Sequence, residues 1–241
     1  MSFLNEHPPR WAAKFSEWIV VRGPAGGVYL TFDDGPDPDT TLRFLDQLAS
    51  LDCLATFFML GEKVAKHPSL ARRVAETGHT IGIHGYTHES WLLKSSEWVG
   101  KEIERTRSAI FDATGVNATL CRPPYGRIGP GALKSVRELG LPFILWTICP
   151  DDWKPTPPAD LVLRATEKTH DGDIILLHDS GRGAETTLAA LPYIVSALRD
   201  KGLKPISLFT TVILNPSPPG TQSNCHPSSA MGEESRSGGA L

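Results

Sequence analysis

The sequence has little of several features that define whole classes of protein. Its 241 residues include only four cysteines, which are widely spaced and form no CxxC pair: Cys53, Cys121, Cys149 and Cys225. That number is too small for a disulfide-stabilised scaffold, so we expect free thiols. No apolar run approaches the ~20 residues needed to cross a bilayer. The 24 Lys+Arg nearly balance the 27 Asp+Glu, and no basic cluster would track a phosphate backbone, so nucleic acid is not expected as a partner.

The N-terminal region also lacks the apolar stretch of a signal peptide, because prolines and charged residues interrupt it. Two locations are therefore compatible with the sequence: the cytoplasm, or export directed by a segment that these 241 residues do not include. Trp11, Phe15 and Trp18 occur at helical spacing. Residues 1–27 are expected to be an N-terminal extension whose short helix packs over one end of the domain, since a membrane-surface helix would need more cationic residues.

The rest of the chain alternates short apolar, β-branched runs with amphipathic stretches. Strands are expected at residues 28–30, 55–60, 80–84, 120–122, 142–146, 173–177 and 204–208, and helices at 38–51, 61–77, 96–113, 131–139, 159–169 and 186–200. This alternation indicates βαβ units and a mainly parallel sheet, and about seven units favour an α/β barrel over an open sheet. The length fits one such domain, residues 28–214.

The last residues, 215–241, have a different composition. They are rich in Ser, Pro and Gly and contain almost no aliphatic side chains. Such a segment buries too little apolar surface to offset its ordering entropy, so we expect a disordered tail.

Two adjacent carboxylates, Asp33 and Asp34, follow the first expected strand. Because successive strand side chains point to opposite sides, one carboxylate can face a metal ion while its neighbour faces a substrate. A polar turn is the ordinary alternative for Asp-Asp-Gly-Pro, and it is favoured if this stretch is taken alone.

His84 and His88 follow the third expected strand. Two histidines four residues apart can face the same way on a helical turn and reach one cation. Gly85 excludes the HExxH signature of metalloproteases, which needs Glu at that position. Asp34 also falls at a C-terminal strand end, where barrel active sites are built. The three side chains form a two-histidine, one-carboxylate set that suits zinc best and is shared with non-haem iron; two unrelated surface histidines are the alternative.

Polar residues also follow the next three strands, in the stretches RPPYG (122–126), CPDDW (149–153) and LLH (176–178). Arg122 is placed to orient a carboxylate by charge-assisted hydrogen bonds. Each stretch has an ordinary alternative: a proline turn, a buried Trp beside an acidic loop, and a core histidine. Five polar motifs at five strand ends are harder to explain in this way.

In their order and spacing, TFDDGP, HGYTH, RPPYG, CPDDW and LLH resemble the five motifs of the polysaccharide deacetylases of carbohydrate esterase family four, over residues 28 to about 210. The resemblance implies a distorted (β/α) barrel with about seven strands, one divalent metal that is usually zinc, and metal-dependent removal of N-acetyl groups from an N-acetylated polysaccharide or oligosaccharide. It also implies these roles: Asp33 as general base, Asp34, His84 and His88 as metal ligands, Arg122 as the residue that orients Asp33, the Tyr125 N–H as an oxyanion donor, Trp153 and Leu176 as the acetyl pocket, and His178 as general acid.

Two positions depart from the family pattern. Gly85 stands where Ser or Thr usually steadies the metal loop, so we expect weaker support of that loop. Cys149 stands where an acidic residue usually tunes the catalytic histidine. A neutral thiol would favour the imidazolium of His178 much less than a carboxylate does, and Asp151 and Asp152 are expected to point elsewhere.

Three rival functions stay open on the sequence. A deacylase of a smaller amide could use the same fold, because substrate choice resides in loops that the motifs do not describe. An inactive carbohydrate-binding relative would not need the complete set of ligands together with Asp33. A non-haem iron oxygenase would give no role to Asp33 or His178.

Overall fold

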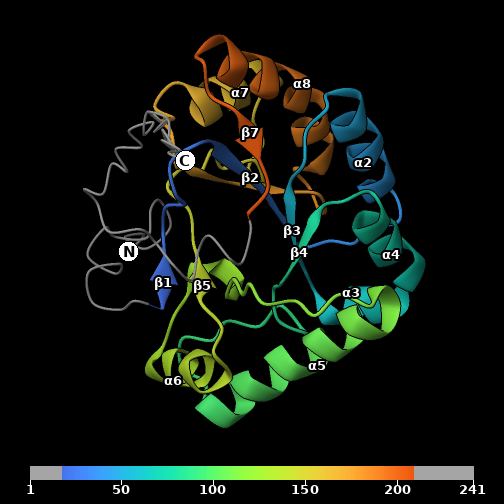
Figure 1. Cartoon of the computed structure of the whole chain (residues 1–241), viewed down its shortest axis with the longest axis vertical. Coiled ribbons are helices and arrows are strands. Elements are labelled where there is room, and N and C mark those ends of the chain that lie inside the picture. The colour runs from blue at the N-terminus through green and yellow to red at the C-terminus, as the bar shows by residue number, and fades with distance from the viewer. Residues whose placement is uncertain (1–17, 209–241) are drawn as a thin grey trace, which may run out of the picture.

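The structure is a computed structural model of the whole chain, and it describes residues 18–208. Its strands are β1 (Ile19–Val20), β2 (Val28–Asp33), β3 (Thr56–Met59), β4 (Thr80–Ile83), β5 (Phe143–Ile144), β6 (Ile174–His178) and β7 (Pro205–Ile206). Its helices are α2 (Thr41–Ser50), α3 (Gly61–Lys66), α4 (Pro68–Glu76), α5 (Ser96–Thr114), α6 (Pro130–Leu139), α7 (Pro158–Thr166) and α8 (Ala184–Asp200), with a 3₁₀ turn at Pro124–Gly126. The helices surround the strands on their outer side, in an arc from α7 and α8 to α6 (Figure 1).

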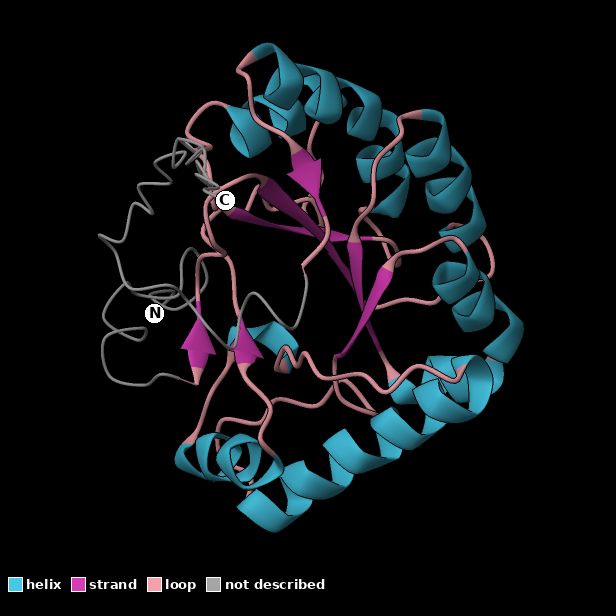
Figure 2. Ribbon diagram, viewed as in Figure 1, coloured by secondary structure: helices cyan, strands magenta, loops and turns pink. Residues whose placement is uncertain are grey.

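All strand pairs are parallel, as expected for βαβ units. One sheet has the order β4-β3-β2-β6, with β7 also paired to β2, and β1 pairs with β5. Single bridges at Cys121 connect β4 to β5, and a bridge from Ile148 connects the chain after β5 to β6. Pairing therefore runs from β2 through β3, β4 and β5 to β6, which pairs with β2 again. The distorted α/β barrel predicted from the sequence is confirmed, and the helices form an open arc on the outer side of the strands (Figure 2).

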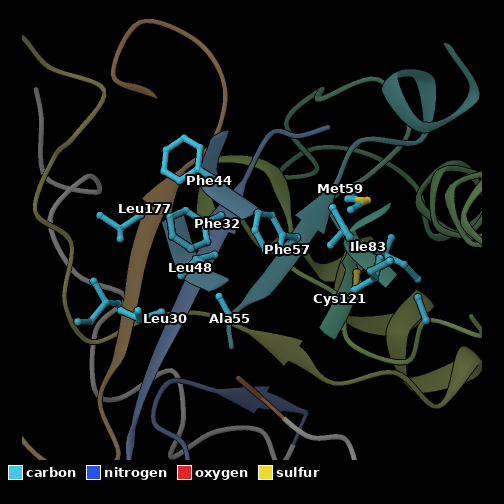
Figure 3. Close-up of a cluster of buried hydrophobic side chains, with 14 of the residues drawn as sticks. Leu30, Phe32, Phe44, Leu48, Ala55, Phe57, Met59, Ile83, Cys121 and Leu177 are labelled. Carbon is cyan, nitrogen blue, oxygen red and sulfur yellow. The ribbon is translucent and has the colours of Figure 1, made fainter. Parts of the chain in front are cut away.

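The core between the sheet and α2 fixes the strand that carries the two carboxylates. Phe32 of β2 is fully buried; its ring centroid lies 5.1 Å from that of Phe57 on β3 and 5.2 Å from that of Phe44 on α2 (Figure 3). Burial of each such side chain contributes about 1.5–3 kcal/mol. Thr31 and Asp33 alternate with Phe32 and so point to the opposite side of β2, toward the barrel interior.

Three of the observed elements differ from the expected ones. The helix expected at 61–77 is divided into α3 and α4, because His67 precedes Pro68 and a residue before proline is disfavoured in the helical conformation. Pro68 then begins α4, where its missing N–H costs nothing. Ile19–Val20 form a strand that was not expected within the N-terminal extension, since Ile19, Val20 and Val21 are β-branched and residues 19–20 pair with β5. The strand expected at 120–122 is reduced to the single bridge residue Cys121.

Other expectations concern residues beyond the described part. Trp11 and Phe15 of the expected N-terminal helix, the expected tail at 215–241, and Cys225 lie outside residues 18–208. Within that range Cys53, Cys121 and Cys149 are free thiols. No helix among the described residues is long and apolar enough to cross a membrane.

Candidate active site

The side chains expected to carry chemistry gather at one rim of the barrel, because parallel strands end on the same side. β2 ends at Asp33 and β6 at His178, and these two residues are direct neighbours across the strand pair. His84 follows β4, and Arg122 follows the bridge residue Cys121.

Asp34, His84 and His88 form a compact cluster of possible metal ligands. Asp34 Oδ1 lies 3.4 Å from His84 Nε2 and 3.1 Å from His88 Nε2, and one ligand atom from each residue lies within 4.8 Å of the others. Asp34 Oδ1 is buried and makes no hydrogen bond to any described residue. A buried carboxylate oxygen without a donor, facing two imidazole nitrogens, fits a divalent cation with open coordination positions.

The protonation states of this cluster also suit a metal. His84 Nδ1 lies 2.9 Å from the carbonyl oxygen of Arg122; a carbonyl only accepts, so Nδ1 carries the proton and Nε2 presents its lone pair to the cluster. Burial raises the pKa of Asp34, but the neighbouring imidazoles of His84, His178 and His88 outweigh it, and the pKa lies below its ordinary value. Burial lowers the pKa of His88 more than the charge of Asp34 raises it. A carboxylate and neutral imidazoles are the forms that bind metals.

Asp33 is held by a fully buried arginine. Arg122 Nη1 donates to Asp33 Oδ1 at 2.7 Å and to Thr31 Oγ1 at 2.8 Å. Arg122 Nε and Nη2 donate to the carbonyl oxygens of Ile144 and Leu145 at 3.0 and 3.1 Å, respectively. Asp33 Oδ2 lies 3.7 Å from His84 Nε2. The arginine therefore holds one oxygen of Asp33 and leaves the other facing the metal-ligand cluster.

His178 has a carboxylate partner. The expectation that Asp152 points away from His178, and that only the neutral Cys149 thiol is available to it, is therefore wrong. Asp152 Oδ1 lies 2.8 Å from His178 Nδ1, and Asp152 Oδ2 accepts from the His178 backbone N–H at 2.7 Å and from Thr187 Oγ1 at 2.8 Å. The Cys149 thiol instead donates to Asp151 Oδ1 at 3.8 Å. The positive φ of 60° at Asp151 turns the chain, so that Asp152 faces β6 while its neighbour does not.

The pair with Asp152 changes the acidity of His178. Burial lowers the pKa of His178, but the charge and hydrogen bond of Asp152, with the charges of Asp34 and Asp33, outweigh it and raise the pKa to about 9. Burial raises the pKa of the Cys149 thiol to about 12, so this thiol is neutral near pH 7. The imidazolium of His178 is therefore the form present at neutral pH.

Aromatic and apolar side chains border these polar groups. The Tyr125 ring lies over His88, with 4.5 Å between centroids, and its side chain is half exposed. Trp153 meets His178 edge to face at 5.3 Å. Leu176 is buried in the apolar cluster against which Trp153 packs. The structure thus brings all nine residues singled out from the sequence to one rim.

Backbone conformation marks the same loops. Five non-glycine residues of the described chain have positive φ, and four of them lie in the loops just described: Asp34, His88, Tyr125 and Asp151. Such conformations cost free energy and concentrate at functional sites. Asp152 and Thr187 also belong to the site, although neither was predicted from the sequence. Asp152 lies within CPDDW and is a possible partner of His178 from that motif, whereas no motif indicates Thr187.

Known proteins with sequences similar to this chain are deacetylases. Residues 21–144 match the family described as polysaccharide deacetylase. A peptidoglycan-N-acetylglucosamine deacetylase of Listeria monocytogenes is 35% identical over 181 residues, 75% of this chain and 38% of the relative's length. A chitooligosaccharide deacetylase of Rhizobium leguminosarum bv. trifolii is 37% identical over 193 residues, 75% of this chain and 89% of the relative.

The fold is shared with solved structures of the same family. The crystal structure of the Bc1960 peptidoglycan N-acetylglucosamine deacetylase superposes with a TM-score of 0.78 at 31% identity, over 83% of this chain and 94% of the other. The chain therefore belongs to the polysaccharide deacetylase family. Together with the Asp34, His84 and His88 cluster, this membership indicates a divalent metal.

Proposed function

We propose that this chain is a metal-dependent hydrolase that removes N-acetyl groups from an N-acetylated polysaccharide or oligosaccharide. The observation that carries the proposal is the placement of a three-ligand cluster beside two separately oriented groups, Asp33 held by Arg122 and His178 held by Asp152. Amide hydrolysis needs both a base for water and an acid for the leaving amine.

Asp34, His84 and His88 would hold the metal, and zinc is the ion we propose, because one carboxylate and two imidazoles with an open position are typical of catalytic zinc sites. When bound, the ion supplies a Lewis acid for the acetamide carbonyl and lowers the pKa of water.

Asp33 would act as the general base. Its Oδ1 is held by Arg122, which leaves Oδ2 to accept a proton from the attacking water. The fully buried Arg122 fixes the direction of this carboxylate, and its other bonds to Thr31 and to two backbone carbonyls fix the guanidinium itself.

His178 would act as the general acid, donating from Nε2 to the departing amine while Asp152 stabilises the imidazolium at Nδ1. The N–H of Tyr125 would donate to the oxyanion that develops on the carbonyl. Trp153 and Leu176 would provide an apolar surface for the acetyl methyl group.

The substrate class follows from the named relatives. The similar proteins described above act on peptidoglycan N-acetylglucosamine or on chitooligosaccharide by name, and an N-acetylated hexosamine is common to both. A smaller amide is the alternative substrate. An inactive glycan-binding relative is less favoured, because the metal-ligand set, the base and the acid are all present in the described chain.

The proposal is tested by metal analysis of the purified protein combined with measurement of acetate release from chitooligosaccharides, peptidoglycan and a small N-acetyl amide. We expect one divalent ion per chain and acetate release from at least one glycan. If acetate is released only from the small amide, the substrate is a smaller amide and not a glycan. Glycan binding without any acetate release would favour the inactive alternative.

A further inference from the structure

The loop that joins the two histidines has an unusual backbone. Gly85 has a φ of +86° and His88 a φ of +55°. A Cβ added at Gly85 would lie 3.2 Å from the Trp91 ring and 3.4 Å from Pro124. A serine or threonine at this position would be strained, and glycine offers the loop no side-chain hydroxyl.

Glu102, on α5, provides that support. One of its oxygens, Oε2, accepts three hydrogen bonds from the loop: from the Tyr86 N–H at 2.9 Å, the Thr87 N–H at 2.9 Å and Thr87 Oγ1 at 3.0 Å. Glu102 is only 4% exposed. A buried carboxylate is costly in free energy unless it is well hydrogen-bonded. The three donors to one oxygen therefore indicate that Glu102 is specifically placed to bind this loop.

The two residues that Glu102 binds are Tyr86 and Thr87, which lie between the histidines. The carbonyls of the same loop are also occupied, since Gly61 N–H donates to Gly85 O at 3.0 Å and Glu62 N–H to Tyr86 O at 3.1 Å. The guanidinium of Arg105, one turn along α5, lies 3.7 Å from the centroid of the Tyr86 ring. The first N–H groups of α3 therefore bind carbonyl oxygens of the loop, and Glu102 binds its N–H groups and the Thr87 hydroxyl.

We infer that Glu102 is a positioning residue for the metal site: it fixes the loop so that His84 and His88 present their Nε2 atoms at the spacing a single ion requires. The inference rests on the proposed function, because it assumes that Asp34 and the two histidines bind the metal. Loss of the carboxylate would leave two backbone N–H groups and one hydroxyl without their acceptor. Groups that orient metal ligands in this way typically change metal affinity by about 10–100-fold when removed.

The test measures zinc affinity of the metal-stripped protein by competition with a chromogenic chelator. Glu102→Ala should bind zinc about 10–100-fold more weakly than the unaltered chain. Glu102→Gln keeps the shape and a neutral acceptor, and should lose about fivefold, because bonds to a charged acceptor are stronger. The matched control is Glu104→Gln on the same helix, where the side chain is exposed and pairs with Arg107; its zinc affinity should not change.

Saturating zinc separates positioning from general stability. It should restore acetate release by Glu102→Ala toward that of the unaltered chain, whereas a loss due to misfolding would persist. A folded Glu102→Ala, or a folded Glu102→Gln if the alanine variant does not fold, that binds zinc as tightly as the unaltered chain would overturn the inference. Failure of the unaltered chain itself to bind zinc or release acetate would instead count against the proposed function.

Discussion

Replacement of Asp152 by Asn tests whether a carboxylate sets the acidity of His178. Asp152 and the other nearby groups raise the pKa of His178 from 6.5 to about 9, a difference worth about 3 kcal/mol at ~1.4 kcal/mol per pH unit. In the variant an amide oxygen can still accept from the His178 N–H and from Thr187. The amide nitrogen would then face Nδ1 as a donor, which opposes the imidazolium.

The expected result is a shift of the alkaline limb of the kcat/KM profile toward lower pH by about 2.5 units, from about 9 toward the ordinary histidine pKa of 6.5. The sign follows from the direction of the change: the acid is active when protonated, so a lower pKa removes the active form sooner as pH rises. At pH 7.5 the protonated fraction of His178 would fall from about 97% to about 10%, and kcat/KM would fall about tenfold.

The assay is acetate release between pH 5 and 10, with metal content measured for each variant. Asp151→Asn is the matched control, because Asp151 neighbours Asp152 but pairs with Lys154 at 2.8 Å, and Asn tolerates its positive φ of 60°. Its alkaline limb should not move. An unshifted limb in a folded, metal-loaded Asp152→Asn variant would refute the assignment of His178 as the acid that Asp152 stabilises.

Three further changes probe the other groups. His84→Ala should lose both bound metal and acetate release, because two remaining ligands hold zinc poorly; metal analysis that still finds one ion per chain would exclude His84 as a ligand. Asp33→Asn should keep its metal and lower kcat by about 10²–10⁴-fold, and it should fold, since Arg122 retains three other acceptors; loss of the metal instead would mean that Asp33 and Asp34 have exchanged roles. Cys149→Asp should leave the alkaline limb in place, because Asp152 already pairs with His178; a shift to higher pH would show that this pairing is incomplete.

The sequence predicts the barrel well because its signals are local. Buried strands such as β2 and β6 begin with a run of apolar residues, and each ends in a polar residue of a motif, Asp33 and His178. The predicted ligands Asp34, His84 and His88 come together in the structure for the same reason, since parallel strands bring their ends to one rim.

What the sequence could not predict depends on backbone direction within loops. The positive φ at Asp151 decides which of two adjacent carboxylates reaches His178, and a sequence carries little information about such a turn. Glu102 lies on an amphipathic helix where a glutamate is ordinarily solvated, and only the packing of α5 on the loop buries it. Pro68 is a case of a signal that was present, because a proline inside an expected helix predicts a boundary.

The measurement that tests the central claim most directly is acetate release from an N-acetylglucosamine oligomer by the protein before metal removal, after metal removal, and after addition of zinc. The proposed function predicts release by the untreated protein, none after removal, and recovery when about one equivalent of zinc is bound. Undiminished acetate release by the metal-free protein would contradict it.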